Sequence, residues 1–177
     1  MSRRVAYLLL ALSGAAGAAR AEERVIDFEK AETGKPVPTW TEQGVVFKLA
    51  GPLTQSKATG RIMFFPHLAT RHKGILNAMA TEQAIPVQAT FPESVSTVTL
   101  VLWGSTGCPA LLEALDASGN VVDKAALAAV PGRKAPADPI PFVELTVKAP
   151  AIAAIRFSGP RNGEFLAADE IRFVTAK

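Results

Sequence analysis

Apolar and polar residues alternate most clearly between Val95 and Val122, and the rest of the chain repeats this pattern in shorter pieces. Within this stretch Val98, Leu100 and Leu102 share one parity, whereas Trp103 has the other. Successive side chains of a strand point to opposite faces, so the pattern predicts a strand with one face in a hydrophobic core. The many β-branched residues favour the same conformation.

A second strand and a turn follow this first one. The run Leu111–Asp116 places Leu112 on one face and Glu113 on the other. Residues 116–120 predict a turn, because an Asp side chain bonds to nearby backbone and Gly119 supplies a positive φ. Another strand begins directly after the turn.

Shorter alternating runs predict further strands at residues 24–29, 44–49, 61–65, 84–91, 142–147, 151–158 and 169–174. Segments 74–79 and 122–130 fit either a strand or a helical turn, and Pro86 is expected to confine its run to a sheet edge or a bulge. Gly and Pro make residues 30–41 a loop that ends near Trp40. About eight to ten short strands without a long amphipathic helix predict an all-β fold, an antiparallel sandwich or barrel.

Residues 1–21 have the composition of an export signal. A basic start is followed by the apolar run Val5–Leu12 and then by Ala19-Arg20-Ala21, a small-residue cleavage pattern. The apolar run is shorter than the roughly 20 residues that span a bilayer. The alternative interpretation is an ordinary N-terminal helix. We therefore expect a single domain, residues 22–177, that is periplasmic or secreted and is not inserted in the membrane after cleavage of the signal.

The net charge of +3 belongs to this expected signal. Lys and Arg together exceed Asp and Glu by three, and Arg3, Arg4 and Arg20 all precede residue 22. The rest of the chain is therefore electrically neutral, and its charge gives no reason to expect nucleic acid as a partner.

Few residues carry reactive chemistry. Cys108 has no second cysteine with which to form an internal disulfide; it is interpreted as a buried apolar thiol, with an intermolecular disulfide or a reactive thiol as the alternative. His67 and His72 are the only histidines, and zinc needs about three or four ligands. No phosphate-binding loop, nucleophile elbow or zinc-protease motif occurs. We therefore expect that the chain is not an enzyme.

Three parts of the sequence together resemble a known family. They are the opening Ile26–Glu29 with Gly44–Phe47, the middle Leu112–Val121, and the closing Ile152–Gly159 with Asp169–Phe173. In this order they are similar to the jelly-roll sandwiches of the galactose-binding-domain-like class, exported bacterial domains that include carbohydrate-binding modules. The resemblance covers most of residues 22–177. It implies a two-sheet jelly roll, and it suggests a glycan or cell-surface polymer as the ligand.

Many members of that class hold a structural Ca²⁺ ion between the first and last strands. The resemblance places this ion at Asp27, Glu29, Asp169 and Glu170. Carboxylate oxygens suit Ca²⁺, which takes about six to eight oxygen ligands. The alternative is that these acids are solvated strand ends.

Sugar-binding surfaces stack pyranose rings on exposed aromatic side chains. Trp40, in the predicted loop, and Trp103, at an outward strand position, are therefore the candidate ligand-binding residues. The alternative is that both tryptophans cover the ends of the sandwich as core.

The sequence thus favours a non-catalytic exported domain that binds a glycan. An envelope protein that acts through protein contacts without glycan binding is the second hypothesis. A polysaccharide hydrolase on the same fold is a minor third.

Overall fold

The computed structural model of this chain describes residues 22–35, 37–50, 62–66, 73–76, 85–104, 106–135, 138–139, 141–158 and 166–176. The expected export signal and both histidines lie outside the described residues. Within these ranges, no helix is long and apolar enough to cross a membrane.

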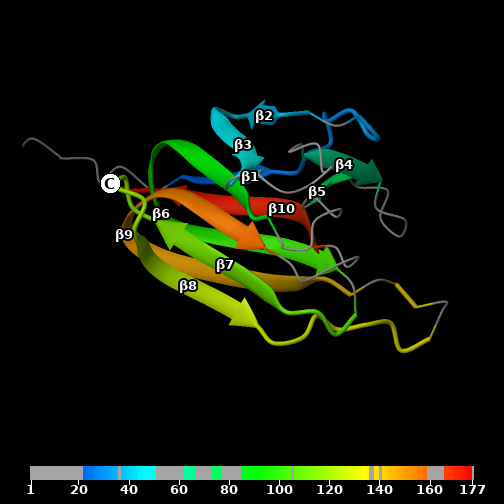
Figure 1. Ribbon diagram of the computed structural model, residues 1–177. Coiled ribbons are helices and arrows are strands. Elements are labelled where there is room, and N and C mark those ends of the chain that lie inside the picture. Colours follow the sequence, from blue (N-terminus) through cyan, green and yellow to red (C-terminus); the bar gives the residue numbers. More distant parts are fainter. Residues whose placement is uncertain are drawn as a thin grey trace, which may run out of the picture.

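Ten β-strands make up the regular structure of the described residues (Figure 1). They are β1 (Glu23–Ile26), β2 (Thr39–Glu42), β3 (Val45–Leu49), β4 (Met63–Pro66), β5 (Lys73–Leu76), β6 (Val87–Gly104), β7 (Ala110–Leu115), β8 (Val121–Leu127), β9 (Val143–Ser158) and β10 (Leu166–Thr175). The all-β prediction is confirmed. The two segments that fitted either a strand or a helical turn overlap β5 and β8, so residues 74–76 and 122–127 form strands.

All ten strands pair antiparallel in one continuous sheet, and the two longest strands fold that sheet into two layers. The first half of β6 and the second half of β9 lie in sheet I with β2, β3, β7 and β8. The second half of β6 and the first half of β9 lie in sheet II with β1, β4, β5 and β10. The predicted antiparallel two-sheet sandwich is confirmed.

β6 and β9 cross between the layers at bends where their pairing shifts register. The shifts lie between Thr90 and Thr97 of β6. Pro92 of β6 and Pro150 of β9 lie at the bends with exposed side chains, where a missing backbone N–H costs the ladder least. Strands commonly switch sheets at such irregularities. This is why two runs predicted as separate strands, before and after Pro150, form one long strand.

The run that contains Pro86 is not an edge strand, which corrects the prediction from the sequence. Residues 87–90 pair with β3 on one side and with β9 on the other. Pro86 directly precedes β6 and replaces no donor of the ladder, so proline is tolerated beside a central strand.

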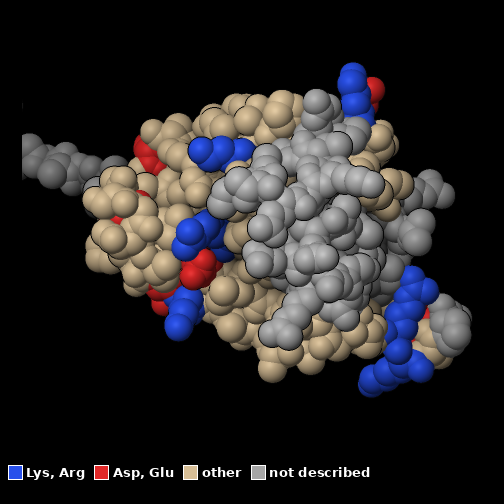
Figure 2. Space-filling view, viewed as in Figure 1, with Lys and Arg blue, Asp and Glu red and all other residues tan. Residues whose placement is uncertain are grey.

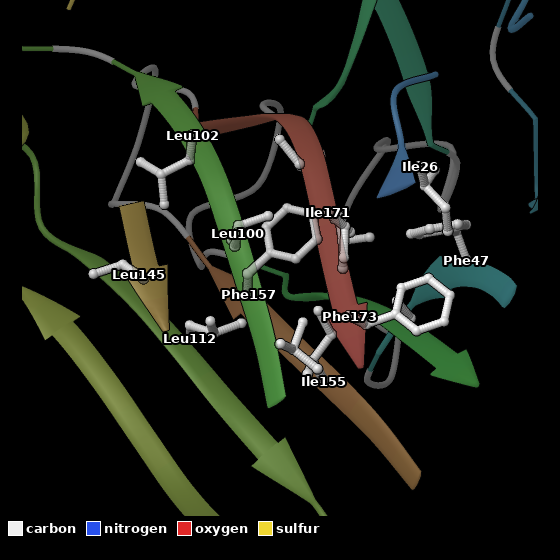
Figure 3. Close-up of a cluster of buried hydrophobic side chains, with 14 of the residues drawn as sticks. Ile26, Phe47, Leu100, Leu102, Leu112, Leu145, Ile155, Phe157, Ile171 and Phe173 are labelled. Carbon is white, nitrogen blue, oxygen red and sulfur yellow. The ribbon is translucent and has the colours of Figure 1, made fainter. Parts of the chain in front are cut away.

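The inward faces of the two sheets meet in one hydrophobic core. Phe157 and Leu112 of sheet I are fully buried, as are Leu100 and Ile171 of sheet II. Figure 3 shows these side chains between the two layers. The parity predicted for β6 is confirmed, and the Cys108 thiol is buried in the same core, as its ordinary interpretation expected.

The turn between β7 and β8 forms as the sequence predicts. Asp116 Oδ1 accepts the backbone N–H groups of Ser118 and Asn120 at 2.9 and 2.8 Å, and Gly119 has a φ of 84°. The hydrogen bond from the Asn120 side chain, together with these backbone bonds, lowers the pKa of Asp116. The turn fixes the register of the hairpin that ends sheet I.

Candidate functional site

Five polar side chains form a row across the outer face of sheet I, which we call the polar row. One residue comes from each of the neighbouring strands β3, β6, β9, β7 and β8, and each is the registered partner of the next. The row consists of Lys48, Gln88, Arg156, Glu113 and Lys124. Its members face outward because the residues beside them in the chain, such as Phe157 and Leu112, point into the core.

Arg156 and Glu113 form the centre of the polar row. Arg156 Nη2 lies 3.0 Å from Glu113 Oε2, and the two side chains are only 32% and 23% exposed. The Arg156 Nε atom is buried and has no hydrogen-bond partner among the described residues. Since a guanidinium carries five N–H donors, Arg156 can hold Glu113 and still donate to an oxygen of a ligand.

A row of small and apolar residues lies beside the polar row on the same face. Thr90 and Leu115 are both registered partners of Ala154, one on each side, and Ala154 and Leu115 are buried. Gln88 Nε2 donates to Thr90 Oγ1 at 3.2 Å, which joins the two rows. The face therefore carries hydrogen-bonding groups beside a strip of small and apolar residues, two of which are buried.

Sequence reasoning missed the polar row as a site. It placed Glu113 and Arg156 at outward positions, which is confirmed, but it gave no means of knowing that their strands are neighbours. In four of the five strands the signal was a single polar residue between apolar neighbours, whereas Lys124 in β8 follows Asp123. Such residues meet only if their strands are neighbours in the sheet, and the alternation within one strand does not predict which strands are neighbours.

Trp103 is not exposed, which corrects the prediction from the sequence. Its parity is as predicted, because it lies on the face of β6 opposite Leu100 and Leu102. Phe65, Phe142 and Ala167 pack around it, however, and leave the residue only 7% exposed. Trp103 is thus the centre of a small aromatic cluster on the outer side of sheet II. Ligand binding by Trp103 stays a prediction.

Trp40 lies in a strand, β2, and not in a loop. Its ring packs edge-on against Phe64, with centroids 5.0 Å apart, on the inner side of sheet I. Its Nε1 atom donates to Glu42 Oε2 at 3.5 Å, and partial burial raises the pKa of Glu42. The structure therefore does not bring Trp40 and Trp103 to one surface, and binding by Trp40 also stays a prediction.

The first and last strands lie side by side, as the calcium hypothesis required. β1 pairs with β10 in a register that aligns Ile26 with Ile171. Next to β1, on the same edge of β10, β5 aligns Ile75 with Ala168. Strand β1 ends at Ile26, earlier than predicted, because Phe28 has a positive φ of 58° and turns the chain away.

The four acids of the calcium hypothesis nevertheless take separate roles. Asp27 Oδ1 accepts the backbone N–H of Glu29 at 3.1 Å. Asp169 is buried beneath the sheet surface, whereas Glu170 is paired with Arg172. No three His, Cys, Asp or Glu side chains gather in the described part of the chain. The structure thus does not assemble these acids into a calcium site.

A lysine lies beside one of these acids, Glu29. The Lys73 ammonium group donates to the Glu29 carbonyl oxygen at 2.6 Å, and the Lys73 backbone N–H donates to Glu29 Oε1 at 3.3 Å. These bonds join the end of β1 to the start of β5. Of the four acids, Glu29 is thus engaged through both its carbonyl oxygen and its carboxylate by Lys73.

Calcium removal tests this arrangement directly. We expect Tm to be the same in EGTA and in added CaCl₂, because a ligand raises Tm only if it binds the folded state. Differential scanning fluorimetry of the same protein sample in both buffers, with MgCl₂ as the control for ionic strength, measures the difference. A rise of several degrees with CaCl₂ alone would restore the calcium hypothesis.

The outer face of sheet II carries a self-contained charge cluster. Arg172 Nη2 lies 2.9 Å from Glu144 Oε1, and Arg172 Nε pairs with Glu170. The hydrogen bond from Glu170, followed by that from Glu144, raises the pKa of Arg172. Arg172 resembles Arg156 in exposure, at 35%, but two carboxylates engage it.

Comparison with known proteins yields structural likenesses only. No family model and no curated protein matches the sequence. A family 29 carbohydrate-binding module is similar with a TM-score of 0.49 and 14% identity, over 89% of this chain and 94% of that one. A family 61 module in complex with β-1,4-galactotriose is similar with a TM-score of 0.40 and 13% identity, over 84% of this chain and 94% of that one. The K2 adhesin domain of Lys-gingipain is similar with a TM-score of 0.42 and 14% identity, over 85% of this chain and 97% of that one.

These likenesses extend no further than the general architecture, which the strand pairing already establishes. Two of the three structures are carbohydrate-binding modules, which the sequence also resembles. The assignment of a ligand rests on the residues of this chain.

Proposed function

We propose that this chain is a non-catalytic binding domain for a glycan or a hydroxyl-rich cell-surface polymer, and that the polar row is its contact surface. The observation that carries the proposal is the alignment of five polar side chains across five neighbouring strands, with the 32% exposed Arg156 at the centre. Neighbouring strands lie about 4.8 Å apart. The row therefore offers a hydrogen-bonding group at intervals comparable to the length of one sugar unit.

The chemistry of the row suits hydroxyl groups in particular. A hydroxyl both donates and accepts a hydrogen bond, and the row supplies donors on Arg156 and Lys48, an acceptor on Glu113, and both on Gln88. Charged groups make the stronger hydrogen bonds of such a set. Sheet strands hold these side chains in fixed register, which lowers the entropy cost of binding. The export signal expected from the sequence places such a domain in the periplasm or outside the cell, where polysaccharides occur.

Substitution of Arg156 tests the proposal. Arg156→Ala is expected to weaken binding to a bound polysaccharide roughly tenfold or more, because hydrogen bonds to a charged group are removed. Affinity gel electrophoresis against a panel of neutral and acidic polysaccharides first finds the ligand. Isothermal titration calorimetry then measures the dissociation constant of each variant.

Arg172→Ala is the matched control, because it removes a similarly exposed, carboxylate-paired arginine from the opposite face. It should leave the affinity unchanged, and circular dichroism should show both variants folded. Equal losses in the two variants, or no loss in Arg156→Ala, would remove the polar row as the site.

A protein partner is the second candidate function, in line with an envelope role. Strand β8 ends the sheet, and both Val121 and Val122 are exposed on it. An uncovered edge strand can accept a strand from another protein. This candidate would be favoured if no glycan binds and cross-linking identifies a defined protein partner. Turnover of a polysaccharide in the same panel would instead indicate a hydrolase.

A further inference from the structure

The charge on the outer face of sheet I is locally unbalanced. Among the outward positions of its six strands, the charged residues are Lys48, Lys124, Arg156 and Glu113. Three of these are basic and one is acidic. Figure 2 shows the basic side chains in a line over β3, the centre of the sheet and β8, with acidic atoms between them. This local excess is notable because residues 22–177 carry no net charge.

The excess lies at the two ends of the polar row. Glu113 neutralises Arg156 at the centre through their ion pair. Lys48 and Lys124, by contrast, are exposed and form no ion pair with any described residue. The polar row thus consists of an ion-paired, neutral centre between two lysines that form no ion pair with a described residue.

The separation of the two lysines favours an extended ligand. Four strand-to-strand steps separate β3 from β8, which corresponds to roughly 19 Å between the lysine backbones. A single small anion cannot contact both charges. A polymer that carries a carboxylate on successive sugar units can contact both, and its hydroxyl groups then lie against the central Arg156 and Gln88.

We infer that the ligand of the polar row is an acidic polysaccharide, of the uronic-acid type. This inference rests on the proposed function and adds the substrate class to it. Lys48 and Lys124 select the charge of the polymer, whereas the central residues recognise its hydroxyl groups. Nucleic acid is the less favoured polyanion, because the two tryptophans, Trp40 and Trp103, pack against other aromatic rings and offer no stacking platform on this face.

The test compares two polymers that differ only in charge. Polygalacturonate and its methyl-esterified form share one backbone, and calorimetry in calcium-free buffer at low salt gives the affinity of the whole chain for each. The acidic form is expected to bind at least tenfold more tightly, and 0.5 M NaCl should remove most of this difference because salt screens exposed charges. The Lys48→Gln/Lys124→Gln double variant should lose roughly 3- to 10-fold in affinity for the acidic form only.

Lys35→Gln/Lys148→Gln is the matched control, since it removes two exposed lysines that lie away from the polar row. It should behave like the unmodified chain. Two outcomes would overturn the acidic class and leave the proposed function standing. The first is equal affinity for the two polymers. The second is binding of neutral polysaccharides only, provided that Arg156→Ala still lowers the affinity for them. Failure of every polysaccharide would overturn both, and tighter binding of a single-stranded DNA oligonucleotide than of polygalacturonate would assign the charge to nucleic acid instead.

Discussion

Phe157→Ala is expected to lower the free energy of unfolding by about 3–5 kcal/mol, the range for removing a buried phenylalanine from a core. Phe157 is fully buried and lies on the half of β9 that pairs with both β6 and β7. Its ring lies between the layers, close to Leu100 and Leu112 (Figure 3). Strands of both sheets bound the cavity that the substitution leaves, so the cavity cannot collapse unless hydrogen-bonded strands shift.

Urea denaturation followed by tryptophan fluorescence measures this loss. Phe142→Ala is the matched control, because Phe142 is only half-buried and lies in the small aromatic cluster outside the core. Phe142→Ala should lower the free energy of unfolding clearly less than Phe157→Ala does. A loss below about 1.5 kcal/mol for Phe157→Ala, typical of well-tolerated hydrophobic exchanges, would contradict the core described for the sandwich.

Trp103→Ala is expected to destabilise the fold by about 3–5 kcal/mol, as for other buried aromatic residues. The hypothesis that Trp103 is a ligand platform predicts the opposite result, a stable protein that has lost its ligand. The difference follows from Phe65, Phe142 and Ala167, which cover the outer side of the indole. A side chain that points away from the core is thus still removed from water.

Two measurements on Trp103 variants separate these outcomes. The first is the midpoint of urea denaturation for Trp103→Ala and Trp103→Phe, where the phenylalanine should keep much of the stability by filling most of the space. The second is polysaccharide affinity of Trp103→Phe, which should equal that of the unmodified chain if the polar row is the site. An unchanged midpoint together with lost binding in Trp103→Ala would instead support Trp103 as a ligand platform.

The sequence was sufficient to predict the fold class because its alternation is local. Each run of Val, Leu, Ile and Phe at every second position reports its own inward face, as residues 98–102 do. It was insufficient to predict that β6 and β9 pass through both layers. A proline within a run looks like the end of a strand, and only the partner strands show that Pro92 and Pro150 mark bends.

The candidate site was harder to predict than the fold because it depends on strand order. Arg156 and Glu113 are 43 positions apart in sequence and become neighbours only through the pairing of β7 with β9. Trp103 illustrates the complementary difficulty: parity predicts the face of a strand, but not whether Phe65 from another strand covers it. The contact between Lys73 and Glu29 likewise depends on how the strands are arranged, so the positions of the four acids in the sequence could not predict it.

The pairing of β1 with β10 has a consequence for how the protein is made. Glu23, near the start of β1, is aligned with Val174, near the end of β10, so the first strand finds its partner in the last. A chain that emerges N-terminus first from a ribosome keeps β1 unpaired until β10 has also emerged. Contacts so distant in sequence also slow folding. The topology therefore makes closure of the sandwich depend on a pairing between residues about 150 positions apart.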